Sequence, residues 1–130
     1  MSKTQKTISL VSQILVALIL GQTLFFKFTG AQESIYIFSR LGAEPWGRIG
    51  SGLIELVAII LILIPRTAVY GAVIALGTMA GAIGAHLFVL GIEVADDGGL
   101  LFGLAIVSFL CSGIVILLRR SELLRLLNRS

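Results

Sequence analysis

Charged residues are scarce in this chain. Asp, Glu, Lys and Arg together make up 13% of its 130 residues, whereas 57% are hydrophobic. A soluble domain carries about 25% charged and about 45–50% apolar residues. A chain this short cannot hide so much apolar surface in a core of its own. The composition therefore argues against a soluble globular domain, and the mean hydropathy of +1.05 indicates a lipid environment.

Cysteine and histidine each occur once, as Cys111 and His86. A disulfide needs two thiols, so a self-contained thiol–disulfide reaction is excluded, and Cys111 is predicted to be an inert packing residue in an apolar run. A single histidine argues against a haem site. The adjacent Asp96 and Asp97 lack the alternating spacing of a calcium loop, so no metal site is predicted.

Four long apolar runs are present, and each approaches the length of about 20 residues that a helix needs to cross about 30 Å of hydrocarbon. Lipid offers no hydrogen bonds to the backbone, so each run must be helical. Between the first two runs, the apolar spacing of residues 33–41 predicts an amphipathic surface helix, capped by Gln32 or Ser34. The sequence therefore predicts an all-α membrane protein, a four-transmembrane-helix bundle in a single domain of residues 1–130. The predicted spans are residues 8–28, 46–64, 67–90 and 99–118.

The distribution of basic residues predicts the orientation. Seven lie on one side of a four-span arrangement and three on the other, and basic residues favour the cytoplasmic side. Both termini are therefore expected in the cytoplasm, with a multi-pass chain in the inner (plasma) membrane. The first run is interpreted as an uncleaved span. The net charge of +3 is then a topology signal, and no nucleic-acid partner is expected. The seven residues are Lys3, Lys6, Arg66, Arg119, Arg120, Arg125 and Arg129.

The C-terminal segment, residues 119–130, alternates leucines with arginines. It is interpreted either as an amphipathic segment on the cytoplasmic leaflet or as a frayed cationic tail. The third apolar run is rich in small residues, including Gly77 and Gly81 at the spacing of closely packed membrane helices. It is therefore expected to be the central helix, packed on most sides. Small-residue faces on the later runs serve either packing within the chain or a homodimer.

Three of the four apolar runs carry an ionisable residue: Lys27, Glu55 and His86. Such groups cost about 2.5–3.5 kcal/mol each in a bilayer, so they normally face the protein interior. Glu55 follows Trp46 by nine residues, which places it about 13 Å deep by helical rise. Gln22 lies at nearly the same depth. Glu55, His86, Lys27 and Gln22 therefore form the candidate binding site, a polar intramembrane cluster, and no catalytic set is recognised.

Each ionisable residue also has a structural interpretation. Glu55 either accepts a proton or holds a polar or cationic ligand group, or it makes an interhelical hydrogen bond or ion pair. For His86 a hydrogen bond across helices is favoured over a ligand contact. For Lys27, which lies at the end of its run, the favoured interpretation is that the side chain extends outward to the membrane surface.

Two segments resemble the DoxX family of small bacterial membrane proteins. These are LFFKFTG at residues 24–30 and GSGLIELVAIILILIPRT at residues 50–67, in which Gly52, Glu55 and Leu56 match the family's second-span signature. GTMAGAIGAHL at residues 77–87 and DDGGLLF at residues 96–102 resemble the DoxX-like branch. The resemblance implies a four-helix inner-membrane protein and a link to redox complexes, since members include a subunit of a thiosulfate:quinone oxidoreductase.

Three functions follow from these observations. The favoured one is a non-catalytic membrane subunit associated with a redox or envelope complex, with the lipid bilayer and a redox protein as partners and quinone or lipid in the polar site. The alternative is a small proton-coupled transporter that uses Glu55. A self-sufficient enzyme has the least support, because Glu55 and His86 alone would have to serve as its acid–base pair.

Overall fold

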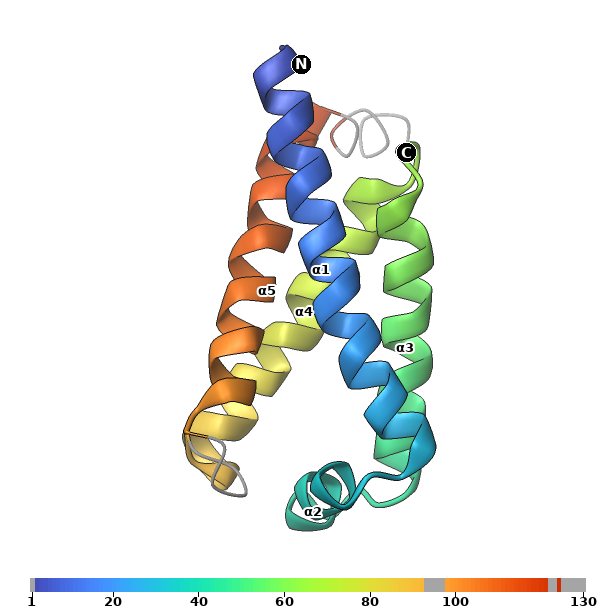
Figure 1. The fold of residues 1–130 in the computed structure, drawn as a ribbon, viewed down its shortest axis with the longest axis vertical. Helices are drawn as coiled ribbons and strands as arrows, with labels where there is room; N and C mark the ends of the chain where they lie inside the picture. Colours follow the sequence, from blue (N-terminus) through green and yellow to red (C-terminus); the bar gives the residue numbers. More distant parts are fainter. Residues whose placement is uncertain (1, 93–97, 122–123, 125–130) are drawn as a thin grey trace.

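The computed structural model describes residues 2–92, 98–121 and 124, and within them every regular element is a helix (Figure 1). Four helical segments are long and apolar enough to cross a membrane. The predicted fold class is confirmed: four long apolar helices, with one short helix between the first two. The chain is a multi-pass membrane protein whose apolar helices contact lipid. In chain order the elements are α1 (Lys3–Thr29), α2 (Gln32–Arg40), α3 (Trp46–Leu63), α4 (Ala68–Ala85), the single-turn π-helix η1 (His86–Leu90) and α5 (Leu100–Leu118).

The four long helices pack in a ring in the order α1, α3, α4, α5, and α5 closes the ring against α1 (Figure 1). Large side chains from α1, α3 and α5 meet at its centre, where Val16, Leu20, Ile62 and Val115 are fully buried. Large apolar side chains such as Leu18 cover the outside. An apolar core inside an apolar exterior is what a bundle in lipid requires, because its outer surface faces acyl chains.

The prediction that the third run is central is wrong. α4 occupies one place in the ring, with α3 and α5 as its main neighbours. Around Gly77, Gly81 and Gly84, no atom lies within 4 Å of the position a Cβ would occupy. Gly71 is the residue at which α4 closely approaches α3. Small residues permit a close approach but do not compel one, so the glycine content does not indicate how many neighbours a helix has.

α1 extends beyond the predicted span of residues 8–28 and begins at Lys3, because Ser2 and Gln5 form a reciprocal cap. The Gln5 backbone N–H donates to Ser2 Oγ at 3.1 Å, and the Ser2 backbone N–H donates to Gln5 Oε1 at 3.0 Å. These bonds satisfy backbone donors that have no partner within the helix. At the other end α1 stops at Gly30, whose φ of +69° suits glycine. Gly30 turns the chain directly into α2.

α2 lies across one end of the bundle, which we call the α2 end (Figure 1). The predicted caps Gln32 and Ser34 are wrong: Ala31 occupies the cap position without a side-chain hydrogen bond, and Ser34 is buried. Arg40 Nη2 donates to the carbonyl oxygen of Val89 at 3.3 Å and so ties α2 to η1. α2 also contacts α1 and α3. Asp96, Asp97 and most of the predicted tail (residues 122, 123 and 125–130) lie outside the described residues.

Candidate functional site

Lys27 and Glu55 form a buried ion pair between α1 and α3. Lys27 Nζ donates to Glu55 Oε1, and the two side chains are 10% and 3% exposed. Side chains on a helix lean toward its N-terminus, which at the end of α1 means toward the bundle interior. The expectation that Lys27 extends to the membrane surface is therefore wrong. The interhelical ion pair, one of the two interpretations left open for Glu55, is present.

The two residues meet because the end of α1 lies beside the first turns of α3. Arg48, in the first turn of α3, donates through Nη1 to the carbonyl oxygen of Lys27. Its Nε donates to both carboxylate oxygens of Glu44, at 2.9 and 3.1 Å. A Cβ added at Gly52 would lie 2.8 Å from Cε1 of the Phe28 ring, so the helices are close there. Lys27, at the end of its run, therefore reaches Glu55 although helical rise places Glu55 about 13 Å deep.

The second oxygen of the Glu55 carboxylate, Oε2, is buried and has no hydrogen-bond partner in the described part of the chain. A buried polar atom without a partner costs about 1–3 kcal/mol. Lys27 Nζ lies 5.5 Å from the centre of the Phe38 ring on α2, at the distance of a cation–π contact. In this ion pair, one oxygen of the Glu55 carboxylate is therefore bonded to Lys27 of α1, and the other oxygen, Oε2, is an acceptor without a donor.

His86 begins the π-helical turn η1 and is 5% exposed. Its Nδ1 lies 2.9 Å from the carbonyl oxygen of Gly91, and the Gly91 backbone N–H donates to the carbonyl oxygen of His86 at 2.7 Å. Since a carbonyl can only accept, Nδ1 carries the proton, and Nε2 of the neutral ring is an acceptor. The favoured interpretation, a bond across helices, is wrong: the ring bonds within its own segment and packs edge-on against Phe102 of α5, 5.5 Å between ring centres.

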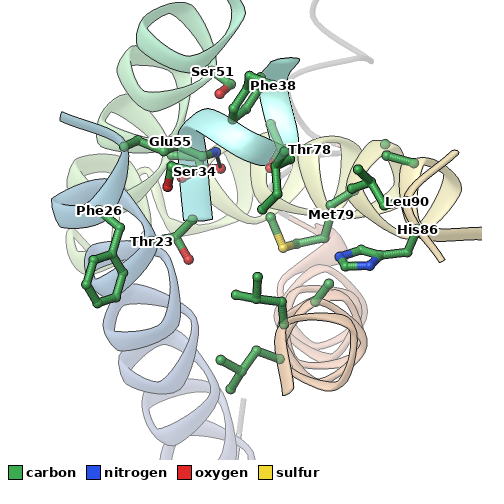
Figure 2. Close-up of a pocket in the computed structure, with 18 of the residues that line it drawn as sticks. Thr23, Phe26, Ser34, Phe38, Ser51, Glu55, Thr78, Met79, His86 and Leu90 are labelled. Atoms are coloured by element: carbon green, nitrogen blue, oxygen red, sulfur yellow. Dashed lines mark hydrogen bonds and ion pairs between the residues drawn. The ribbon is translucent and has the colours of Figure 1, made fainter. Parts of the chain in front are cut away.

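A cavity of about 530 Å³ lies between α1, α3, α4 and α5, with α2 across it. Figure 2 shows Glu55, Thr23 and Ser34 on one side of the hollow and Met79 and His86 on the other. All four residues of the predicted polar cluster line it: Gln22, Lys27, Glu55 and His86. Whether they bind a ligand stays a prediction. Apolar side chains from five elements complete the wall, among them Ile19, Phe26, Ile37, Phe38, Met79, Leu101, Leu104 and Ala105.

Five residues that line the cavity are exposed, and three of them lie on the parts of α1 and α5 nearest to α2. Gln22 and Phe26 of α1 and Leu100 of α5 line the cavity and are also exposed. Among the described residues Gln22 has no hydrogen-bond partner, although an amide facing hydrocarbon is unfavourable without one. We call the opening between Gln22, Phe26 and Leu100 the lateral mouth. Its residues belong to two of the candidate spans, so the mouth opens toward the surrounding lipid.

A second polar cluster, which the sequence analysis missed, lies at the opposite end of the bundle. Gln13 Nε2 donates to the carbonyl oxygen of Ile62 at 2.7 Å, and Ser9 Oγ donates to Gln13 Oε1 at 2.8 Å. Arg119 Nε donates to Ser9 Oγ at 3.0 Å, and its Nη1 donates to the carbonyl oxygen of Pro65 at 3.3 Å. The cluster therefore joins α1, the end of α3 and the end of α5. The available signal was Ser9 and Gln13 one turn apart in an apolar run.

Replacing Gln13 with leucine, which has a similar volume, is expected to lower the free energy of unfolding by about 1–2 kcal/mol. The change leaves the carbonyl oxygen of Ile62 without its side-chain donor and the hydroxyl of Ser9 without its acceptor. Ser108→Ala is the matched control, because the Ser108 hydroxyl is buried with no partner among the described residues and its removal should be neutral or stabilising. Detergent-induced unfolding measures both, and equal losses in the two variants would contradict the assignment.

The charged groups that line the cavity are Lys27, Glu33 and Glu55, so its wall carries one more negative than positive group. Within the described residues, no three His, Cys, Asp or Glu side chains come together as metal ligands would. The arrangement suits a molecule with a small polar head and an apolar body, because a few polar atoms are set in an apolar wall.

No protein-family model, no curated protein and no solved structure matches this chain.

Proposed function

We propose that this protein is a non-catalytic membrane subunit that holds the head group of a quinone or lipid in its intramembrane cavity. The observation that carries the proposal is that Glu55, whose buried Oε2 atom has no partner among the described residues, lines a cavity of about 530 Å³. Ligand sites are typically about 300–1,000 Å³, mostly apolar, with a few polar groups that orient the ligand. Both features occur together here.

The residues present fit such a molecule. A quinone supplies a planar ring with polar oxygens at opposite ends, and the cavity has polar side chains on opposite walls, Glu55 with Lys27 on one and His86 on the other. An isoprenoid or acyl tail would leave through the lateral mouth into the surrounding lipid.

The resemblance to DoxX-like proteins supports an association with a redox partner in the inner membrane. The distribution of basic residues supports cytoplasmic termini, with α2 on the external side. The proton-coupled transporter receives less support, because Lys27 already compensates the charge of Glu55. A transporter of the proposed type needs a carboxylate that a proton and a cationic substrate can share.

The proposal predicts that one amphiphile stays bound when the protein is gently extracted from membranes. Native mass spectrometry of the purified protein should detect this adduct, and extraction with organic solvent should identify it. Ala82→Phe, which fills the cavity, is expected to abolish the adduct. Ala80→Phe is the matched control, since Ala80 is exposed on the same helix and does not line the cavity.

The accessibility of Cys111 to a thiol reagent reports whether both variants fold, because this thiol is buried in the native bundle. Two results would contradict the proposal. One is that the wild-type protein carries no adduct under any gentle extraction. The other is that a folded Ala82→Phe variant retains the adduct as fully as Ala80→Phe does.

A further inference from the structure

We infer that the cavity selects amphiphiles with a neutral head group that donates hydrogen bonds, such as a hydroxyl, over head groups that only accept them or are anionic. This inference rests on the proposed function, since it specifies the ligand of the same cavity. It follows from the number of hydrogen-bond donors and acceptors on the cavity wall and from the charge of that wall.

Three of the four hydroxyl groups on the cavity wall have already used their protons, and Ser34 is the fourth. Thr23 Oγ1 donates to the carbonyl oxygen of Ile19 at 3.0 Å, and Thr78 Oγ1 donates to that of Ala75 at 3.0 Å. Ser51 Oγ donates in the same way to the carbonyl oxygen of its own helix neighbour Arg48, at 3.3 Å. A hydroxyl has one proton and two lone pairs, so each of these oxygens can now only accept.

The two ionisable groups on opposite walls offer further acceptors. Glu55 Oε2 is buried without a partner among the described residues, and in a neutral His86 ring Nε2 is left as an acceptor because Nδ1 donates to the Gly91 carbonyl oxygen. The donors that remain near the cavity are two of the three Lys27 Nζ protons, the hydroxyl proton of Ser34 and the two amide protons of Gln22 at the mouth, which makes five protons against nine lone pairs on the acceptors named above. Acceptors therefore outnumber donors, and a complementary ligand must bring protons of its own.

The charge of the wall argues against anionic head groups. Lys27 is the one cation among the described lining residues, and Glu55 neutralises it. Glu33, exposed at the edge of the cavity, adds a negative charge. A phosphate or carboxylate head would lose its hydration and meet no free cation, which is strongly unfavourable. A neutral hydroxyl head meets the acceptors without this penalty.

Two membrane sources supply this chemistry. One is the reduced, dihydroxy form of a quinone, whose two hydroxyls lie at opposite ends of a planar ring. The other is a glycerolipid with free hydroxyls, such as a monoacylglycerol. Each has a close analogue that lacks the donors: the oxidised quinone in the first case and a fatty-acid methyl ester in the second. These matched pairs separate donor recognition from the shared apolar contribution.

The test measures binding of four neutral probes and one anion to the protein in nanodiscs. The probes are a decyl-substituted hydroquinone, kept reduced without oxygen, its oxidised quinone, monooleoylglycerol, methyl oleate and oleate. We expect at least one donor-bearing probe to bind about 10-fold more tightly than its donor-free analogue, since an unsatisfied buried acceptor costs about that factor. Oleate should bind no more tightly than methyl oleate. Preference for the hydroquinone or for monooleoylglycerol identifies the source.

Variants test which side chains cause the preference for donor-bearing probes. Thr78→Val keeps the side-chain shape but removes one acceptor, and it should weaken the hydroquinone or monooleoylglycerol several-fold while leaving the donor-free analogue unchanged. Thr29→Val is its control, because Thr29 also donates to its own helix, to Phe25 at 2.8 Å, but does not line the cavity. Glu55→Gln replaces one oxygen with a donor and should shift preference toward the oxidised quinone. Thr78→Val remains informative if Glu55→Gln fails to fold.

The outcomes distinguish this inference from the proposed function. If each donor-bearing probe binds no better than its analogue, or if oleate binds best, the inference is overturned while the cavity remains a ligand site. If none of the five probes binds the folded protein, the proposed function fails and the inference fails with it. A selectivity that is identical in the wild-type protein and in Thr78→Val would also overturn the assignment of the acceptors.

Discussion

The variant Lys27→Met is expected to lose about 3–5 kcal/mol of unfolding free energy, because removing one partner of a buried ion pair leaves the other charge uncompensated. Glu55 is 2% exposed and is the tenth residue of α3, so its carboxylate is almost fully shielded from solvent. Replacing the other partner, in Glu55→Gln, should lower the free energy of unfolding by less. Lys27 lies in the last turn of α1, and its flexible stem can then extend to the surface.

A double variant tests whether the two residues act as a unit. Lys27→Met combined with Glu55→Met removes both charges and is expected to recover most of the lost stability, since apolar replacements of buried ion pairs are often neutral or stabilising. Lys6→Met is the control, because Lys6 is exposed near the start of α1 and its replacement should change stability by less than about 0.5 kcal/mol. A double variant as unstable as Lys27→Met alone would contradict the pairing.

Labelling of the single cysteine, Cys111, measures the unfolding of these variants. Cys111 is 9% exposed in the core of the bundle, so a maleimide should label it only after unfolding. The labelling rate against temperature or denaturing detergent gives the unfolding midpoint of every variant without added reporter groups. Each variant needs its own reference in fully denaturing detergent, where all thiols react.

The second large effect is expected at Gly71, on the side of α4 that faces α3. A Cβ at this position would overlap the backbone nitrogen of Ile62 and lie 2.8 Å from the carbonyl oxygen of Ala58. Backbone atoms cannot move aside as a flexible side chain can, so Gly71→Ala must separate the two helices. We expect a loss of about 3 kcal/mol, at the upper end of the usual penalty for overpacking.

Gly77→Ala on the same helix is the matched control. No atom lies within 4 Å of its Cβ position, so the added methyl group faces lipid and should change stability by less than about 0.5 kcal/mol. Cys111 labelling and the midpoint of detergent-induced unfolding measure both variants. Similar midpoints for Gly71→Ala and Gly77→Ala would show that α3 and α4 do not approach each other as closely as described.

The sequence predicts the fold class because hydrophobic length alone decides which segments cross a bilayer. It also indicates the polar cluster, since ionisable groups in apolar runs are rare and noticeable. It did not reveal that Lys27 reaches Glu55. Helical rise measures depth along one helix, but the offset between two helices depends on how α1 and α3 pack. That offset is fixed by the Arg48 bond to the end of α1 and by the contact of Phe28 with Gly52.

Two further features depend on local geometry that periodicity does not encode. The π-helical turn at His86 forms where Gly91, with φ of +83°, ends the helix and donates its N–H back to the His86 carbonyl oxygen. The acceptor character of Thr78 appears only once its hydroxyl proton is assigned to Ala75. In the sequence, a threonine in a span is equally a donor and an acceptor, so no pattern of residues distinguishes the two.

The position of the lateral mouth decides which competitors a ligand must displace. An opening between Gln22, Phe26 and Leu100 meets the acyl chains of every neighbouring lipid, whose local abundance far exceeds that of any minor component. Dilution in water is then irrelevant, and occupancy depends on the mole fraction of the ligand within the bilayer. A purely apolar cavity would fill with bulk phospholipid. Discrimination between ligands must therefore come from the few polar atoms that line the cavity.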